Sequence, residues 1–143
     1  MSIFDLLKQG IISSSAEETM AIAAQLSTFV PENHLIALHG DLGAGKTTFV
    51  KGLARGWEIK EEVTSPTFNI YTIYEGKRNL VHLDAYRLCN EEDIENLLLT
   101  EFLISPYCLV IEWPENIASI LTSNAWHIYL NIEKNQSHLI KLS

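Results

Sequence analysis

Basic residues are scarce in this chain. Lysine and arginine together number 10, against 18 aspartate and glutamate residues, so the formal net charge is −8 over 143 residues. No cluster of lysine and arginine occurs anywhere in the sequence. Because direct binding to a nucleic-acid backbone needs a basic face, this shortage makes the chain by itself a poor candidate for a nucleic-acid-binding protein.

Cysteine is scarce as well. The two cysteines, Cys89 and Cys108, stand far apart and belong to no C-x-x-C motif. Zinc sites and redox-active pairs need more closely spaced thiols, often with histidine nearby. We therefore expect both cysteines to be buried apolar residues.

Long apolar runs are missing too. No stretch approaches the roughly 18 residues that a membrane-spanning helix requires. The first ten residues, "MSIFDLLKQG", are too few and too acidic for a signal peptide. We therefore expect a cytoplasmic protein without membrane association. Its length of 143 residues favours a single domain over residues 1–143.

A glycine-rich stretch, "GDLGAGKTT" at residues 40–48, stands out against this background. It matches the pattern G-x-x-x-x-G-K-[ST] of phosphate-binding loops. The apolar run at 35–38 precedes it and predicts a strand buried on both faces. Apolar residues spaced as on a helix follow from Lys46 onward. This strand–loop–helix order is the context in which the motif binds a nucleoside triphosphate.

The residue types in the loop suit phosphate chemistry. Glycines allow the backbone to wrap closely around phosphates, so that consecutive N–H groups and the helix N-terminus point at them. Lys46 supplies a cation for the β- and γ-phosphates, and the Thr47 hydroxyl supplies a Mg²⁺ ligand. We expect the nucleotide, ATP or ADP, to contact the following residues: Asp41, Leu42, Gly43, Ala44, Gly45, Lys46, Thr47 and Thr48.

The rest of the chain predicts alternating helices and strands. A capping box begins at Ser15, and an apolar helical stripe follows at Ile22, Ala23, Leu26 and Phe29. Segments 67–74 and 80–88 read as an antiparallel hairpin, and 108–111 as a second buried strand. Asn90 caps a further helix with an apolar face at Ile94, Leu97 and Leu98. Together these elements predict a three-layer α/β fold, like that of P-loop nucleoside triphosphatases, with a mixed parallel and antiparallel sheet.

Two acidic residues are candidates to complete the site. Glu112 directly follows the buried strand at 108–111, where α/β proteins place ligand sites. It stands where aspartate is more usual, and we expect it to hold Mg²⁺ directly or through water. Asp84 lies in "VHLDAYR", where period-2 spacing puts His82, Asp84 and Tyr86 on one strand face. Asp84 is expected to orient the attacking water or a metal-bound water; the alternatives are a surface acid for Glu112 and a half-exposed polar face for Asp84.

Three further residues are candidates for the nucleotide site. Thr67 belongs to "TSPTF", whose hydroxyls resemble those of switch loops that order around a γ-phosphate, although a plain turn fits the same letters. Trp113 follows Glu112. We expect its ring either to contact the nucleotide or to pack against other side chains of the protein. Thr19, in the first predicted helix, is placed near the base, with a solvated helix start as the alternative.

Four motifs in order, "GDLGAGKTT", "SPTF", "HLDAYRL" and "VIEWPE", closely resemble the bacterial TsaE family. The phosphate loop alone is generic, whereas H-x-D-x-Y-R followed by E-W is much more specific. The likeness runs from "EET" in the first predicted helix to at least Ile132.

The resemblance implies a function. Members of this family are small P-loop ATPases needed for threonylcarbamoyladenosine modification of tRNA. They act with two larger partners, a threonylcarbamoyl-transferase subunit and its inactive paralogue, of the TsaD and TsaB type. ATP hydrolysis resets that complex between turnovers. By this likeness Thr47 and Glu112 hold Mg²⁺, and Asp84 supports hydrolysis or contacts a partner. The tRNA is held by the partners, which suits an acidic chain.

Other functions remain as alternatives. A small-molecule kinase usually holds the transferred phosphoryl group with mobile arginines, but this chain has only Arg55, Arg78 and Arg87 and no arginine-rich lid. A signalling GTPase usually carries N-K-x-D, which is absent. A nucleotide-dependent binding module with negligible turnover of its own also fits. Lacking an obvious cis arginine finger, the chain is expected to hydrolyse ATP slowly alone and faster with its partners.

Overall fold

In the described residues one seven-stranded mixed sheet organises the protein, in the order β1-β7-β6-β2-β5-β4-β3. The structure is a computed structural model that describes residues 1–41, 43–66, 70–88, 92 and 99–143. The strands are β1 (Ile11–Ser13), β2 (His34–His39), β3 (Tyr71–Tyr74), β4 (Asn79–Asp84), β5 (Tyr107–Glu112), β6 (Trp126–Ile132) and β7 (His138–Leu142). In the described residues no helix has the length and apolar character needed to cross a membrane.

In the part of the chain that the structure describes, three α-helices and two short 3₁₀ helices accompany the sheet. They are α1 (Ile3–Gln9), α2 (Ala16–Ser27), α3 (Lys46–Gly56), η1 (Leu99–Phe102) and η2 (Pro114–Ile120). The predicted helix capped by Asn90, with Ile94, Leu97 and Leu98, lies outside the described residues. Neither α1 nor β1 was anticipated from the sequence pattern, because both are short.

Parallel strands form the centre of the sheet and antiparallel strands its edges. β5 pairs in parallel with β2 and β4, and β2 also pairs in parallel with β6. β3 pairs antiparallel with β4, which confirms the predicted hairpin, and β7 pairs antiparallel with β6 and β1. The register sets Glu112 beside Leu38 on one side and Asp84 on the other. The carboxyl ends of three parallel strands therefore meet at one edge, where α/β proteins bind ligands.

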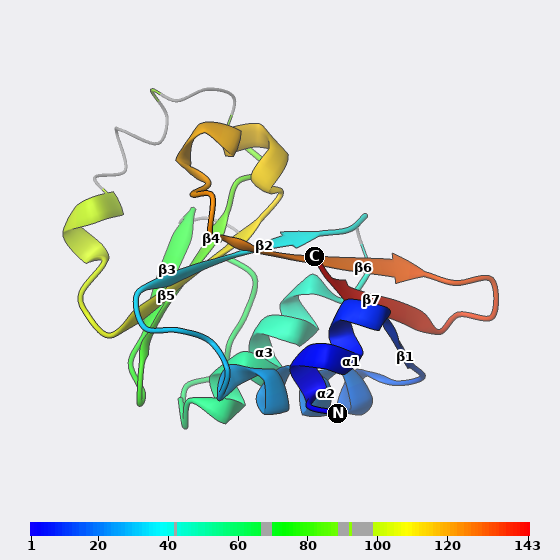
Figure 1. Cartoon of the computed structure of the whole chain (residues 1–143). Coiled ribbons are helices and arrows are strands. Elements are labelled where there is room, and N and C mark those ends of the chain that lie inside the picture. The colour runs from blue at the N-terminus through cyan, green and yellow to red at the C-terminus, as the bar shows by residue number, and fades with distance from the viewer. Residues whose placement is uncertain (42, 67–69, 89–91, 93–98) are drawn as a thin grey trace.

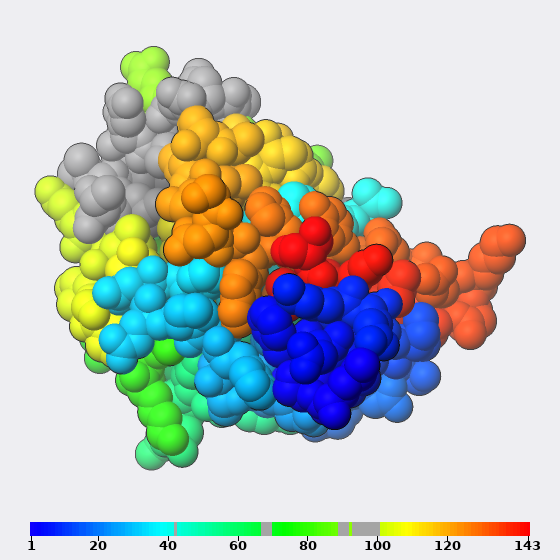
Figure 2. Space-filling model, viewed as in Figure 1, coloured from blue at the N-terminus to red at the C-terminus, as the bar shows by residue number. Residues whose placement is uncertain are grey.

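Helices and the short η2 segment cover opposite faces of the sheet. Figure 1 shows α1, α2 and α3 on one side and residues 114–120, in gold, on the other. Along β2, Ile36 and Leu38 belong to the core cluster on the α-helical side, while Leu35 and Ala37 belong to the second cluster with Ile117. The predicted α/β fold with a mixed sheet is confirmed. The β6–β7 hairpin projects from the body (Figure 2).

Helix α2 begins as the sequence predicts, with one difference in its capping. Ser15 is the N-cap, and its hydroxyl accepts a hydrogen bond from the Glu18 backbone N–H at 3.1 Å. The Glu18 carboxylate accepts from the backbone N–H of Ser14, one residue earlier than the usual box. Phe29 does not belong to the apolar stripe: it follows the end of the helix and is 47% exposed.

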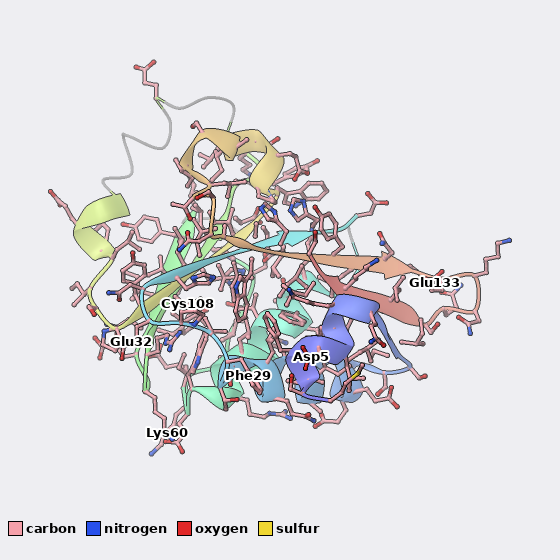
Figure 3. The ribbon with its side chains drawn as sticks, viewed as in Figure 1. Asp5, Phe29, Glu32, Lys60, Cys108 and Glu133 are labelled. Atoms are coloured by element: carbon pink, nitrogen blue, oxygen red, sulfur yellow. The ribbon has the colours of Figure 1, made fainter. Side chains whose placement is uncertain are left out.

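Cys108 is buried in β5, in the interior of the molecule (Figure 3). Burial raises the pKa of its thiol to about 12. Since the thiolate is the reactive form, Cys108 is a packing residue, as expected. Cys89 lies outside the described residues.

Helices α2 and α3 cross closely at Gly52. A methyl group at this position would lie 2.4 Å from the Met20 carbonyl oxygen and 2.6 Å from the Ala23 side chain. We expect Gly52→Ala to lower the free energy of unfolding by about 2–3 kcal/mol, because overpacking outweighs the roughly 1 kcal/mol gain in helix propensity. Urea unfolding measures this, with Lys51→Ala on the same helix as the control. An unchanged or higher midpoint for Gly52→Ala would contradict this close approach.

Candidate functional site

The glycine-rich loop joins β2 to α3. Gly43 and Gly45 have φ values of 84° and 99°, in the left-handed region that favours glycine. Gly45 is also the N-cap residue of α3, so the first backbone N–H groups of that helix face the end of the loop. Gly40 is needed for space, because a Cβ there would lie 2.6 Å from the Leu130 carbonyl oxygen of β6. The local backbone therefore has the form that a phosphate-binding loop requires.

Lys46 is buried at the start of α3. It is 5% exposed, its Nζ donates to the Gly40 carbonyl at 2.7 Å, and it lies 3.6 Å from the centroid of the Trp113 ring. Burial lowers the pKa of Lys46, and the carboxylates of Glu112 and Asp84 oppose that shift. Trp113 thus packs on the loop lysine through a cation–π contact, which the sequence left open.

Glu112 lies beside Thr47 at the end of β5. The Thr47 hydroxyl approaches Glu112 Oε2 at 3.4 Å, and Glu112 is 4% exposed. An acid this deeply buried needs hydrogen-bond donors or cations around it. The surface-acid alternative for Glu112 is therefore wrong.

His82 is a partner of Glu112 to which the sequence assigned no role. Its Nε2 lies 2.6 Å from Glu112 Oε2, and the imidazole is fully buried in β4. The available signal was the period-2 spacing that put His82 and Asp84 on one face. That spacing did not reveal Glu112 as the neighbour, because the pairing of β4 with β5 is a long-range contact.

Asp84 ends β4 and is half-buried beside Glu112 in the register. Its Oδ1 accepts a hydrogen bond from the Tyr86 backbone N–H at 3.0 Å, which closes a turn after the strand. The strand therefore ends at Asp84, and the expected common face includes only His82 and Asp84. Tyr86 is in the turn and 64% exposed, so it does not share a strand face with His82 and Asp84.

A cavity of about 370 Å³ collects most of the predicted residues. Its lining residues are Gly43, Gly45, Lys46, Thr47, Thr48, Ser65, Asp84, Glu112 and Trp113. Asp41 is exposed at the loop, and its carbonyl accepts from the Ala44 N–H at 3.0 Å. Leu42 and Thr67 lie outside the described residues. Three separate elements thus direct cationic, hydroxyl and carboxylate groups into one space.

A second cavity of about 170 Å³ adjoins the loop. It is lined by Ser14, Ser15, Ala16, Thr19, Gly43, Gly45, Thr48, Gln136 and His138. The two cavities share Gly43, Gly45 and Thr48. Thr19 is buried and its hydroxyl lies 2.7 Å from that of Ser13, so the solvated-helix-start alternative for Thr19 is wrong.

His138 lines this second cavity and also contacts the loop. Its Nδ1 lies 2.7 Å from the Ala44 carbonyl oxygen. No motif in the sequence connects β7 with the loop, so Gln136 and His138 were not predicted.

The oxygen ligands near the loop fit Mg²⁺. Among the described residues no group of three or more His, Cys, Asp or Glu side chains is placed to hold a metal. Mg²⁺ bound with nucleotides usually takes only one or two protein ligands, besides phosphate oxygens and water. The Thr47 hydroxyl lies 3.4 Å from the nearest oxygen of the Glu112 carboxylate, close enough for both side chains to hold one octahedral Mg²⁺. This pair suits such an ion.

Comparison with known proteins points to one family. The profile of "Threonylcarbamoyl adenosine biosynthesis protein TsaE" matches residues 13–140. A Treponema pallidum protein named "tRNA threonylcarbamoyladenosine biosynthesis protein TsaE" is 40% identical over 121 residues, 85% of this chain and 90% of that protein. The Bacillus subtilis protein of the same name is 40% identical over 115 residues, 80% of this chain and 72% of that protein.

Solved structures give the same indication. The crystal structure of Bacillus subtilis YdiB superposes with a TM-score of 0.75 at 33% sequence identity. The match covers 92% of this chain and 81% of that one. At this level of identity the likeness extends beyond the general layout of helices and strands.

Proposed function

This chain belongs to the TsaE family, and on that premise we propose that it is a Mg²⁺-dependent ATPase that supports the synthesis of threonylcarbamoyladenosine in tRNA. The names of its relatives support the pathway. The catalytic activity rests on the geometry of the cavity at the carboxyl edge of the sheet. The observation that carries it is the convergence of Lys46, Thr47, Asp84 and Glu112 on that one cavity.

Each of these residues has a role in the proposal. Lys46 contacts the β- and γ-phosphates once its ammonium leaves the Gly40 carbonyl. Thr47 and Glu112 hold Mg²⁺, which when bound neutralises charge that develops on the phosphate oxygens. Asp84 orients the attacking water or contacts a partner protein. We place Trp113 at the phosphate end of the nucleotide, because its ring covers Lys46.

The smaller cavity is our candidate for the nucleoside end of the nucleotide. Its lining includes Thr48 of α3 and Thr19 of α2 and is mostly small or polar. We propose that the nucleoside of ATP or ADP lies there, beside Thr19. Asp41 and Leu42 remain proposals as backbone contacts of the phosphates, and Thr67 remains one for the γ-phosphate. ATP is preferred over GTP because the sequence has no N-K-x-D element.

The partners are proposed to be the transferase subunit and its inactive paralogue, of the TsaD and TsaB type. The net charge of −8 argues against this chain holding tRNA by itself. Contact with tRNA is therefore proposed to be indirect, through those partners, in the cytoplasm.

Slow intrinsic hydrolysis is expected, because none of the described residues that line the phosphate cavity is an arginine. Arg55 pairs with Glu17 on the exposed face of the helices, and Arg78 donates to the Pro31 carbonyl. An arginine finger typically contributes about 10³- to 10⁵-fold in rate. We therefore expect phosphate release to rise at least about tenfold when the two partner subunits and tRNA are added.

A phosphate-release assay with and without the partners and tRNA tests this expectation. Lys46→Met in the same mixture controls for contaminating ATPase. Fast turnover alone that is indifferent to the partners would contradict the resetting role. Binding of Mg²⁺–ATP without turnover under either condition would favour the second candidate, a nucleotide-dependent binding module.

A further inference from the structure

We infer that His82 is a positioning residue that holds the Glu112 carboxylate in the orientation needed for Mg²⁺. This inference rests on the proposed function and adds a residue to it. His82 does not line the phosphate cavity, whereas Glu112 does. Any effect of His82 on the metal is therefore exerted through Glu112.

The geometry of the pair supports a directed hydrogen bond. His82 Nε2 lies 2.6 Å from Glu112 Oε2, with the imidazole fully buried. An ionised carboxylate offers only acceptors, so Nε2 carries the proton and donates it. His82 is paired in the register with Val110, two residues before Glu112 on the neighbouring strand. The imidazole thus reaches diagonally across two strands whose relative position the sheet fixes.

The contact remains available when Thr47 turns to the metal. Oε2 of Glu112 also accepts the long 3.4 Å contact from the Thr47 hydroxyl. If Thr47 directs its oxygen to Mg²⁺, the shorter bond from His82 still holds the carboxylate. Among the described residues both side-chain contacts of Glu112 fall on Oε2, which leaves Oε1 for the metal or a metal-bound water. Fixing one oxygen of a ligating carboxylate so that the group cannot rotate is a common outer-shell role near metals.

A purely structural role explains His82 poorly. Its Nδ1 is buried and has no hydrogen-bond partner among the described residues. A buried polar atom without a partner is costly, so an apolar side chain would suit this site better if packing alone mattered. The hydrogen bond to Glu112 explains why a histidine occupies this buried position.

The experiment measures Mg²⁺ affinity for the complex of the full chain with ADP, by calorimetric titration. His82→Leu removes the donor, and His82→Gln keeps an N–H near the place of Nε2. We expect His82→Leu to weaken Mg²⁺ binding by about 10- to 100-fold, with ADP affinity in EDTA changed less than about threefold. His82→Gln should recover most of the Mg²⁺ affinity. Equal Mg²⁺ affinity in the wild type and His82→Leu, or equal losses in both variants, would overturn the inference.

A double-mutant cycle keeps the inference testable if His82→Leu folds poorly. His82→Asn retains a polar group that is too short to reach Oε2, and it is expected to behave like His82→Leu. In a Glu112→Gln background, His82→Asn should change Mg²⁺ affinity less than about twofold, because the residue it acts through has been altered. Additive losses would overturn the positioning role. If the wild type binds ADP without any response to Mg²⁺, the metal part of the proposed function fails, and the inference fails with it.

Discussion

Lys46→Ala is expected to weaken ATP binding by about 100-fold or more. Removing one member of a buried, hydrogen-bonded charge pair typically costs about 2–5 kcal/mol, and we propose Lys46 as the cation that pairs with the phosphates. In the structure its ammonium is held between the Gly40 carbonyl and the Trp113 ring. Calorimetric titration with a non-hydrolysable ATP analogue measures the loss directly.

Because Lys46 is buried, Lys46→Ala needs a second variant that separates the loss of charge from the loss of packing. The sequence predicts a lysine that contributes to the phosphate site and not to a core, but the side chain is 5% exposed. Alanine therefore also leaves space beneath Trp113, whereas methionine keeps the aliphatic volume and removes only the charge. We expect Lys46→Met to lose ATP affinity as strongly as Lys46→Ala while it unfolds at a temperature closer to that of the wild type. Unchanged affinity in Lys46→Met would contradict the loop assignment.

Glu112→Gln is expected to lower Mg²⁺-dependent ATP hydrolysis by at least about 100-fold in the partner-stimulated assay. The amide is nearly the same shape and its oxygen still accepts the hydrogen bond from His82, so the fold is preserved. The negative charge that attracts Mg²⁺ is lost, and metal-based stabilisation of the transition state contributes several kcal/mol. Binding of ADP in EDTA should stay within about threefold, because the phosphate loop is intact.

Asp84→Asn is the matched comparison, since Asp84 lies beside Glu112 on the next strand. If Asp84 orients water or contacts a partner, its variant should keep Mg²⁺ affinity and lose turnover. Measurement of both quantities separates the two acids. Loss of Mg²⁺ affinity in Asp84→Asn, with none in Glu112→Gln, would show that the roles of the two carboxylates are exchanged.

Local sequence patterns were sufficient for most of the fold near the site. The apolar run at 35–38, the loop glycines and the helix from Lys46 appear in the structure as β2, a loop with positive φ angles, and α3. These features depend on residues close in sequence, such as a glycine that takes a left-handed conformation or an apolar strand between two layers. Tyr86 was misplaced because β4 ends two residues earlier, at Asp84, whose side chain closes a turn.

The sequence by itself determined the ligand class, through a phosphate loop between a strand and a helix, and it identified Glu112 and Asp84 as acids at strand ends. Only the tertiary structure decided what surrounds them: His82 beneath Glu112, Trp113 over Lys46, and His138 against the Ala44 carbonyl. The physical reason is that each of these contacts joins elements far apart in the chain. Their distances depend on strand order and register, which no local pattern of residues specifies.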